Sequence, residues 1–208
     1  MYKILLILSL KLHNFLYKVI SYLSIKNEGG LHPKYRLIKY KDFFLNNIKE
    51  NESVLDIGCG QGALAYDISK KAKSVVGVDF DLDKINFAKE KYKDSSVNFL
   101  CADATKDLKN EKFDVIVMSN VLEHIEHRVE FLKSIHGLAN KYLFRVPMID
   151  RDWVPLYKKE LGLEWRLDLT HFTEFTFAQF KDEFEQAGYR IDFHTVQFGE
   201  IWAIIYPN

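Results

Sequence analysis

A glycine-rich stretch follows a short apolar run in the first third of the chain. Residues 54–62 read Val-Leu-Asp-Ile-Gly-Cys-Gly-Gln-Gly, so the apolar run leads directly into Gly58, Gly60 and Gly62. Glycine is needed where a tight turn brings the backbone close to a ligand, because a Cβ would stand in the way. With Ala63 the spacing also satisfies the dinucleotide fingerprint G-x-G-x-x-G/A. The stretch predicts a nucleoside-binding turn, with a sharp ligand-free turn as the alternative.

An acidic residue ends the next apolar run, in Val75-Val-Gly-Val-Asp79. A carboxylate at that place can accept both hydroxyl protons of a ribose diol. NAD would satisfy it as well as any other nucleoside, so Asp79 supports a nucleoside without identifying it. The alternative role is helix capping, which Asp81 could perform for a helix beginning at Leu82.

Two later motifs distinguish between the nucleoside cofactors. Residues 99–104 read Phe-Leu-Cys-Ala-Asp-Ala, and residues 113–124 read Phe-Asp-Val-Ile-Val-Met-Ser-Asn-Val-Leu-Glu-His. Together with the glycine turn and Asp79, the series over residues 53–147 resembles the class I S-adenosylmethionine-dependent methyltransferases. It is most similar to the small-molecule group that includes ubiquinone-type and sugar methyltransferases. Dinucleotide enzymes share the first two motifs but not the last two.

The resemblance implies that the ends of the first four predicted strands bind S-adenosylmethionine. The residues expected at the cofactor are Asp56, Gly58, Cys59, Gly60, Asp79, Phe80, Asp103, Ala104 and Asn120. The first motif would hold the amino-acid end, Asp79 the ribose, and Phe80 would lie against the adenine. Asp103 would take the adenine amino group and the Ala104 N–H a ring nitrogen. Asn120 would line the cofactor and face the acceptor.

The end of the fourth motif raises the question of a metal. Ubiquinone-type O-methyltransferases and small-RNA terminal methyltransferases use Glu-x-x-Glu-His as metal ligands near this point. This chain has Asn120-x-x-Glu123-His124, so a neutral amide replaces one carboxylate. Hard divalent cations prefer carboxylate oxygens, so we expect no metal. His124 or His171 is instead the candidate general base for an acceptor hydroxyl, with a structural histidine as the alternative.

Nucleic acid is not the expected acceptor. The Asp/Asn-Pro-Pro-Tyr/Phe signature of DNA amino-methyltransferases is missing, since residues 119–122 read Ser-Asn-Val-Leu. Lysine plus arginine and aspartate plus glutamate number 29 each, so the chain has no basic excess to attract phosphates. The two cysteines are typical of reduced cytoplasmic thiols rather than of a disulfide framework.

The elements that carry these motifs alternate between short apolar runs and amphipathic stretches. Strands are predicted at residues 53–57, 74–78, 97–101, 113–118, 142–146, 189–196 and 201–205, and helices at 63–71, 82–92, 126–139 and 177–186. This alternation predicts an α/β fold, a doubly wound, mostly parallel seven-stranded sheet with an antiparallel final strand. Ligands of such sheets bind beyond the carboxyl ends of the strands, where the motifs fall.

Residues 149–171 are predicted to cap the acceptor site of the domain at 51–208. The segment holds several aromatic and charged residues: Arg151, Trp153, Tyr157, Trp165, Arg166 and Asp168. Aromatic faces with fixed hydrogen-bonding partners suit a sugar, although a helical cover packed on the core is the alternative. The following run, His171-Phe-Thr-Glu-Phe-Thr176, resembles one in glycan- and sugar-modifying relatives from bacterial surface-polysaccharide pathways. We therefore expect a small-molecule or glycan acceptor.

Residues 1–50 are predicted to form a helical extension. Residues 3–25 place Leu5, Leu8, Leu12, Phe15, Val19 and Tyr22 on one helical stripe, and the first acidic residue is Glu28. Lys11, His13 and Lys18 interrupt the pattern too often for a membrane span, and no cleavage site of a signal peptide follows. The favoured interpretation is a lid or a homodimer contact; the alternative is a basic amphipathic helix on a membrane surface. In residues 31–36, Tyr35 or Arg36 could reach the cofactor carboxylate, or serve as a surface anchor.

Three functions remain open at this point. The first is an O-methyltransferase acting on a sugar, glycan or similar polar metabolite. The second is an NAD-dependent oxidoreductase that uses the same glycine turn. The third is a non-catalytic methyltransferase-fold module whose basic N-terminal helix docks on a membrane enzyme.

Overall fold

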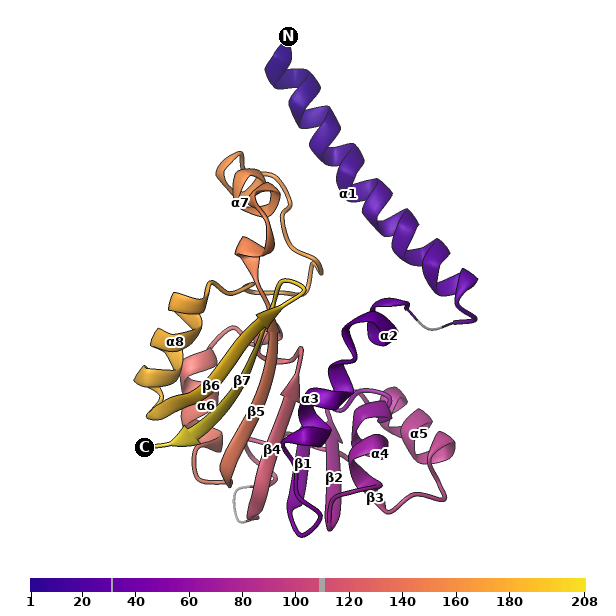
Figure 1. The fold of residues 1–208 in the computed structure, drawn as a ribbon, viewed down its shortest axis with the longest axis vertical. Helices are drawn as coiled ribbons and strands as arrows, with labels where there is room; N and C mark the ends of the chain where they lie inside the picture. The colour runs from indigo at the N-terminus through magenta and orange to yellow at the C-terminus, as the bar shows by residue number, and fades with distance from the viewer. Residues whose placement is uncertain (31, 109–110) are drawn as a thin grey trace.

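A seven-stranded sheet runs through the centre of the computed structural model, which describes residues 1–30, 32–108 and 111–208 (Figure 1). The strands are β1 (Ser53–Ile57), β2 (Ser74–Asp79), β3 (Val97–Cys101), β4 (Phe113–Ser119), β5 (Ala139–Pro147), β6 (Tyr189–Gln197) and β7 (Glu200–Pro207). Their order is β3-β2-β1-β4-β5-β7-β6, and β7 is antiparallel to both of its neighbours. The predicted fold class, including the antiparallel final strand, is confirmed.

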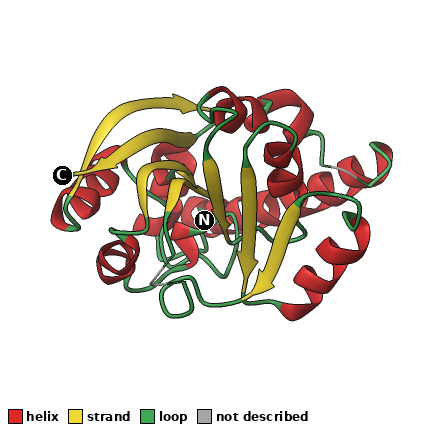
Figure 2. Ribbon diagram, turned by 90° about the horizontal axis from the view of Figure 1, so that it is seen from below, coloured by secondary structure: helices red, strands yellow, loops and turns green. Residues whose placement is uncertain are grey.

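Helices cover both faces of this sheet (Figure 2). They are α1 (Tyr2–Asn27), α2 (Lys34–Ile38), α3 (Tyr40–Asn46), α4 (Ala63–Ser69), α5 (Leu82–Lys91), α6 (Arg128–Ile135), α7 (Trp153–Glu160) and α8 (Phe177–Gln186), with 3-10 turns η1 (Leu122–His124) and η2 (Ile149–Arg151). One apolar core joins the sheet to α3, α4 and α5, and a second joins it to α6 and α8. The central strands are apolar runs because neither of their faces meets water.

The predicted helix over residues 126–139 was too long at its C-terminus. Helix α6 ends at Ile135, and Ala139 already pairs with Phe113 in the parallel ladder between β4 and β5. The backbone N–H of Phe113 donates to the Leu138 carbonyl at 2.9 Å, which fixes this start of the strand. Strand pairing at Ala139 therefore outweighs its helix propensity.

The N-terminal helices differ in how they pack. Helix α3 buries Phe44 completely against the core that also contains Val54 of β1. The predicted helix over residues 3–25 is confirmed as α1, which stands away from the sheet and buries only Leu10 (Figure 1). The segment predicted as a cap, residues 149–171, forms η2, α7 and the connection that follows. Its role toward an acceptor stays a prediction.

Candidate functional site

The carboxyl ends of β1, β2 and β4 meet at the edge of the sheet that lies below α2 in Figure 1. The glycine turn after β1 is held there by tight packing. Gly58 has φ +70°, and a Cβ on it would lie 2.5 Å from a methyl carbon of Val121. Gly62 has φ +79°, and a Cβ there would lie 2.6 Å from the Phe99 ring. Both positions require glycine for conformation and for space.

The amides of this turn are already used within the protein. The N–H groups of Gly58 and Cys59 both donate to the Val78 carbonyl, at 2.8 and 3.0 Å. The Gly60 N–H donates to Oδ2 of Asp79 at 2.9 Å. The turn is therefore fastened to the end of β2, and what it offers a ligand is close approach to its backbone.

Asp79 is the last residue of β2 at this edge, and its side chain is buried. Besides the Gly60 N–H on Oδ2, its Oδ1 accepts the Asp81 N–H at 2.9 Å. A carboxylate has about four lone-pair sites, so both oxygens can still accept ribose hydroxyls. Asp81 itself caps α5 by accepting the N–H groups of Asp83 and Lys84. The two acidic residues therefore do not compete for the capping role.

Two acceptor atoms at this edge are buried without a hydrogen-bond partner in the described part of the chain. They are Oδ2 of Asp56, at the end of β1, and Oδ1 of Asn120, just beyond β4. Burial, followed by the charge of Asp79, raises the pKa of Asp56 to about 8. Asn120 has φ +56°, a conformation in which asparagine is enriched among non-glycine residues. Such orphaned acceptors are costly unless a ligand supplies donors.

The residues predicted at the adenine are arranged less tightly. Phe80 is 87% exposed, so its ring is free to cover a flat ligand. Asp103 is engaged by Thr105 and forms an ion pair with Lys106 at 2.8 Å, which lowers its pKa. Ala104 is buried beside it. An adenine amino group would have to share the Asp103 carboxylate with Lys106.

A hydrogen-bonded chain orients His124 at the other side of the edge. Thr170 Oγ1 donates to Oδ1 of Asp168 at 2.8 Å and lies 2.9 Å from Nδ1 of His124. Since the hydroxyl proton of Thr170 is directed to Asp168, Nδ1 of His124 must donate to Oγ1. That assignment leaves Nε2 of His124 unprotonated and able to accept a proton. Partial burial of the ring, followed by the charge of His171, lowers the pKa of His124 and favours its neutral form.

His171 lies against His124 with the ring centroids 4.7 Å apart, edge to face. Its Nδ1 is 3.0 Å from Oε1 of Glu174, whose side chain is completely buried and is also paired with Arg151. The structure thus brings both predicted base candidates together. Unlike His124, His171 is itself buried.

Glu123 is buried between these groups, with neither carboxylate oxygen hydrogen-bonded to any described residue. Burial raises its pKa to about 8, so the carboxyl is mostly protonated at neutral pH. Its backbone carbonyl accepts the N–H of Phe172 at 2.8 Å and so ties η1 to the segment after the cap. One potential ligand atom from each of Glu123, His124 and His171 lies within 4.8 Å of the others.

The partners of the two histidines were not predicted from the sequence. Thr170 and Glu174 orient His124 and His171 respectively, and Asp168 was noted only as part of a charged stretch. The spacing Asp168-x-Thr170 is typical of a local side-chain turn and was the available signal.

Tyr35 and Arg36, which could reach the cofactor carboxylate or serve as surface anchors, contact other residues of the protein instead. Arg36 forms an ion pair with Glu28 at 3.0 Å, and Tyr35 packs on Tyr40. The pKa of Lys34 in the same stretch is lowered by partial burial, followed by the charge of Arg145. Leu31, the first residue of the predicted stretch, lies outside the described residues.

These residues fit S-adenosylmethionine. The buried orphaned oxygens of Asp56 and Asn120 would accept from its ammonium group, and Asp79 can accept from a ribose diol. The glycine turn admits close approach, and exposed Phe80 can cover a base. The assignment of these roles residue by residue stays a prediction.

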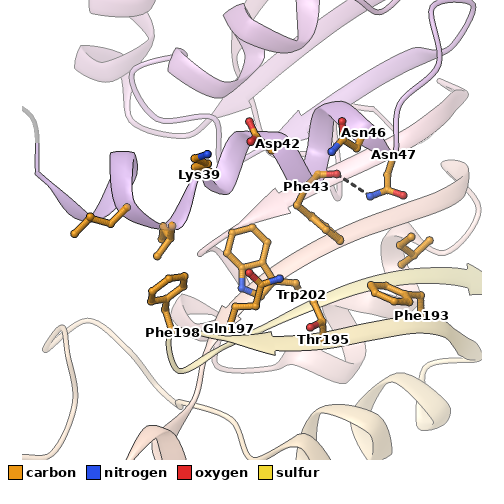
Figure 3. Close-up of a pocket in the computed structure, with 13 residues that line it drawn as sticks. Lys39, Asp42, Phe43, Asn46, Asn47, Phe193, Thr195, Gln197, Phe198 and Trp202 are labelled. Carbon is orange, nitrogen blue, oxygen red and sulfur yellow. Dashed lines mark hydrogen bonds between the residues drawn. The ribbon is translucent and has the colours of Figure 1, made fainter.

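A separate pocket of about 560 Å³ lies on the side of the sheet, between α2–α3 and the β6–β7 pair (Figure 3). The side chains that line it include Phe43, Phe193, Phe198 and Trp202. None of the residues predicted at the cofactor or as a base is among them. The chemistry-bearing residues are therefore gathered at the carboxyl edge and not in this pocket.

Comparison with known families agrees with this geometry. The family described as "Methyltransferase domain" matches residues 31–193. An uncharacterized methyltransferase of Mycobacterium bovis is 34% identical over 89 residues, 42% of this chain and 45% of its own. The ribosomal protein L11 methyltransferase of Thermotoga petrophila is 34% identical over 116 residues, 54% of this chain and 41% of its own. The aligned part is thus less than half of either relative's length.

Solved structures share the fold at low sequence identity. Magnesium protoporphyrin IX methyltransferase from Synechocystis, with bound S-adenosylhomocysteine, has a TM-score of 0.64 and 16% identity and covers 82% of each chain. An S-adenosylmethionine-dependent methyltransferase from Clostridium acetobutylicum has a TM-score of 0.66 and 14% identity, with 93% of this chain and 99% of its own covered. The protein PH0226 from Pyrococcus horikoshii has a TM-score of 0.69 and 19% identity, with 84% and 91% covered.

Proposed function

Because the chain belongs to the class I S-adenosylmethionine-dependent methyltransferase family, we propose that it methylates a hydroxyl group of a sugar, glycan or other small polar metabolite. The observation that carries this proposal is the oriented His124. Its Nδ1 is fixed by Thr170 and Asp168, and its Nε2 is left unprotonated and able to accept a proton. An amine acceptor would have less need of such a base, whereas a hydroxyl oxygen becomes a good nucleophile when its proton is removed.

The cofactor supplies an activated methyl group on its sulfonium. What remains for the protein is alignment of the acceptor and removal of its proton. His124 receives this proton at Nε2, and the lowered pKa keeps the imidazole neutral and ready near neutral pH. The imidazolium that forms is stabilised through Thr170 and the carboxylate of Asp168. Asp168 and Thr170 thus fix the tautomer and the orientation of the His124 imidazole.

The second histidine supports the same proposal as a positioning residue. His171 contacts the ring of His124 and is itself fixed by Glu174, whose other partner, Arg151, belongs to the predicted cap. Arg166 of the cap donates to the His171 carbonyl at 3.1 Å. A rearrangement of the cap around an acceptor would therefore shift His171 and, through it, the ring of His124.

The test is in two steps. Thermal shifts with S-adenosylhomocysteine and with NAD compare the two cofactors, and we expect stabilisation by the first alone. A labelled methyl group is then followed into a panel of sugars, nucleotide sugars and short glycans. Stabilisation by NAD alone would indicate an oxidoreductase, and S-adenosylhomocysteine binding without any transfer would favour a non-catalytic module.

A further inference from the structure

The N-terminal helix α1 presents a broad apolar face to solvent. Its large side chains Leu5, Leu8, Leu12, Phe15, Leu16, Ile20 and Leu23 are each between 45% and 63% exposed. At 3.6 residues per turn they fall within one sector of roughly 140°. This "outer face" is far larger than the isolated apolar side chains that protein surfaces usually carry.

The opposite side of α1 attaches the helix to the domain. Leu10 is buried there, and Asn14 donates to the Glu164 carbonyl at 2.9 Å. Lys158 of α7 donates to Oδ1 of Asn14 at 2.6 Å and lies 3.1 Å from Nδ1 of His13. The domain therefore holds α1 by its polar side and turns the outer face away from the protein.

The charges of α1 are all of one sign. Lys3, Lys11, Lys18 and Lys26 are its ionised side chains, and no acidic residue occurs before Glu28. On the helical wheel Lys11 and Lys18 lie on one flank of the outer face, about 40° and 60° beyond Phe15, and Lys26 falls within its sector at the C-terminal end of the helix. Lysines in that position can extend their ammonium groups to lipid phosphates while the stem stays on apolar surface.

We propose that α1 lies along the surface of an anionic membrane, with the outer face in the lipid and the methyltransferase domain held against it. The match is chemical: a wide apolar sector meets the acyl region, and the bordering lysines meet anionic headgroups. This inference rests on α1 and its contacts alone and is independent of the acceptor proposed above.

Two other occupants fit the helix less well. By length and composition α1 could cross a membrane, but its midpoint is fastened to Lys158 and Glu164 of the domain. A spanning α1 would pull that buried lysine into the hydrocarbon layer. A second copy of α1 could cover the outer face, but its bordering lysines would then meet lysines, with no acidic partner.

The test is sedimentation of the full chain with vesicles of phosphatidylcholine, with and without about one third phosphatidylglycerol. We expect binding to the anionic vesicles and release at high salt, since salt screens lysine–lipid attraction. Phe15→Glu should lower vesicle affinity about tenfold or more, because it removes a large apolar group from the lipid. Phe87→Glu, the matched change at an exposed site of α5, should leave binding intact.

Leu12→Glu serves as a second variant if Phe15→Glu does not fold, and thermal stabilisation by S-adenosylhomocysteine reports folding for both. Equal loss of binding in Phe87→Glu would overturn the proposal. So would vesicle binding that resists both salt and alkaline extraction, which indicates a span. A wild-type dimer that Phe15→Glu converts to a monomer, without vesicle binding by either, would assign the outer face to a second copy instead.

Discussion

The predicted cofactor edge of the sheet and the predicted acceptor side, which holds the two histidines and the ion pair between β5 and β7, differ in how their buried polar groups are paired. At the cofactor edge, Asp56 and Asn120 each keep a buried oxygen without a partner among the described residues. On the acceptor side, buried Arg145 forms a two-fold ion pair with Glu200 at 2.6 and 2.8 Å, and Glu174 joins Arg151 to His171.

The difference indicates which side waits for a ligand. An unpaired buried acceptor costs about 1–3 kcal/mol, and a donor on a bound ligand can recover that cost. A saturated network gains little from a ligand but holds its side chains still, and here it holds the two histidines. Nε1 of Trp202, whose ring lies against Arg145, is one exception on the acceptor side. Glu123 is another, since both of its oxygens lack a partner in the part of the chain described. Its raised pKa, about 8, avoids a buried charge.

The largest effect should come from removing the oriented base. We expect His124→Ala to lower the turnover number by about 10²–10⁴-fold, the usual contribution of general base catalysis. Thr170→Val should cause a smaller loss, because the imidazole remains but its tautomer is no longer fixed. Labelled methyl transfer to the acceptor found in the panel measures both. Because the pKa of His124 is lowered, wild-type activity should stay level near neutral pH and fall only in more acidic buffer.

His127→Ala is the matched control for this prediction. His127 lies three positions further on, exposed at the start of α6. It should retain full activity, and S-adenosylhomocysteine should bind equally to wild type, His124→Ala and His127→Ala. Wild-type turnover by His124→Ala would remove this residue from the mechanism and would leave His171 as the base.

A smaller loss is expected at the ribose position. Asp79→Ala should weaken S-adenosylmethionine binding by roughly 1–3 kcal/mol, the scale for hydrogen bonds to a charged group. Asp103→Ala should cost less, because its carboxylate is exposed and already paired with Lys106. Calorimetry gives both affinities. Unchanged affinity in a folded Asp79→Ala protein would refute the ribose assignment.

Cofactor affinity should change by up to about tenfold per pH unit, which would further distinguish the cofactor edge from the acceptor side. In the ligand-free protein Asp56 has a pKa near 8 instead of 3.8, so it is protonated at neutral pH. Between these two pKa values the folded state therefore binds one more proton at Asp56 than the unfolded state does. The free energy of unfolding accordingly falls as pH rises toward 8. A cationic ammonium favours the carboxylate, so cofactor affinity should rise with pH up to about 8, where the ammonium itself begins to lose its proton. Calorimetry across this range should find the trend flattened in Asp56→Asn; an equal slope in the variant would contradict it.

The two sides also differ in how much the sequence could predict. The strands and the glycine turn were predictable because buried parallel strands are apolar runs and a tight turn requires glycine at fixed positions. The orientation of His124 was not, because Thr170 lies 46 positions away and meets it only when the chain has folded. Likewise Arg145 and Glu200 are 55 positions apart and are brought together by the register of β5 and β7. Short local motifs could be interpreted from the sequence, whereas pairing between residues far apart in the chain could not.

The smallest expected effect is that of a chelator, which should leave the turnover rate unchanged. Glu123, His124 and His171 approach each other closely enough to suggest a metal. However, burial raises the pKa of Glu123 to about 8 in the metal-free protein, so a metal would have to displace a proton to gain this ligand. Asn120 also stands where the metal-dependent relatives carry a carboxylate, so the set lacks one of the oxygen ligands that a hard divalent cation prefers. Turnover measured before and after EDTA should therefore agree. If EDTA abolished turnover and a divalent ion restored it, Glu123 would have to be ionised in the active protein, and the base role of His124 would pass to a metal-bound species.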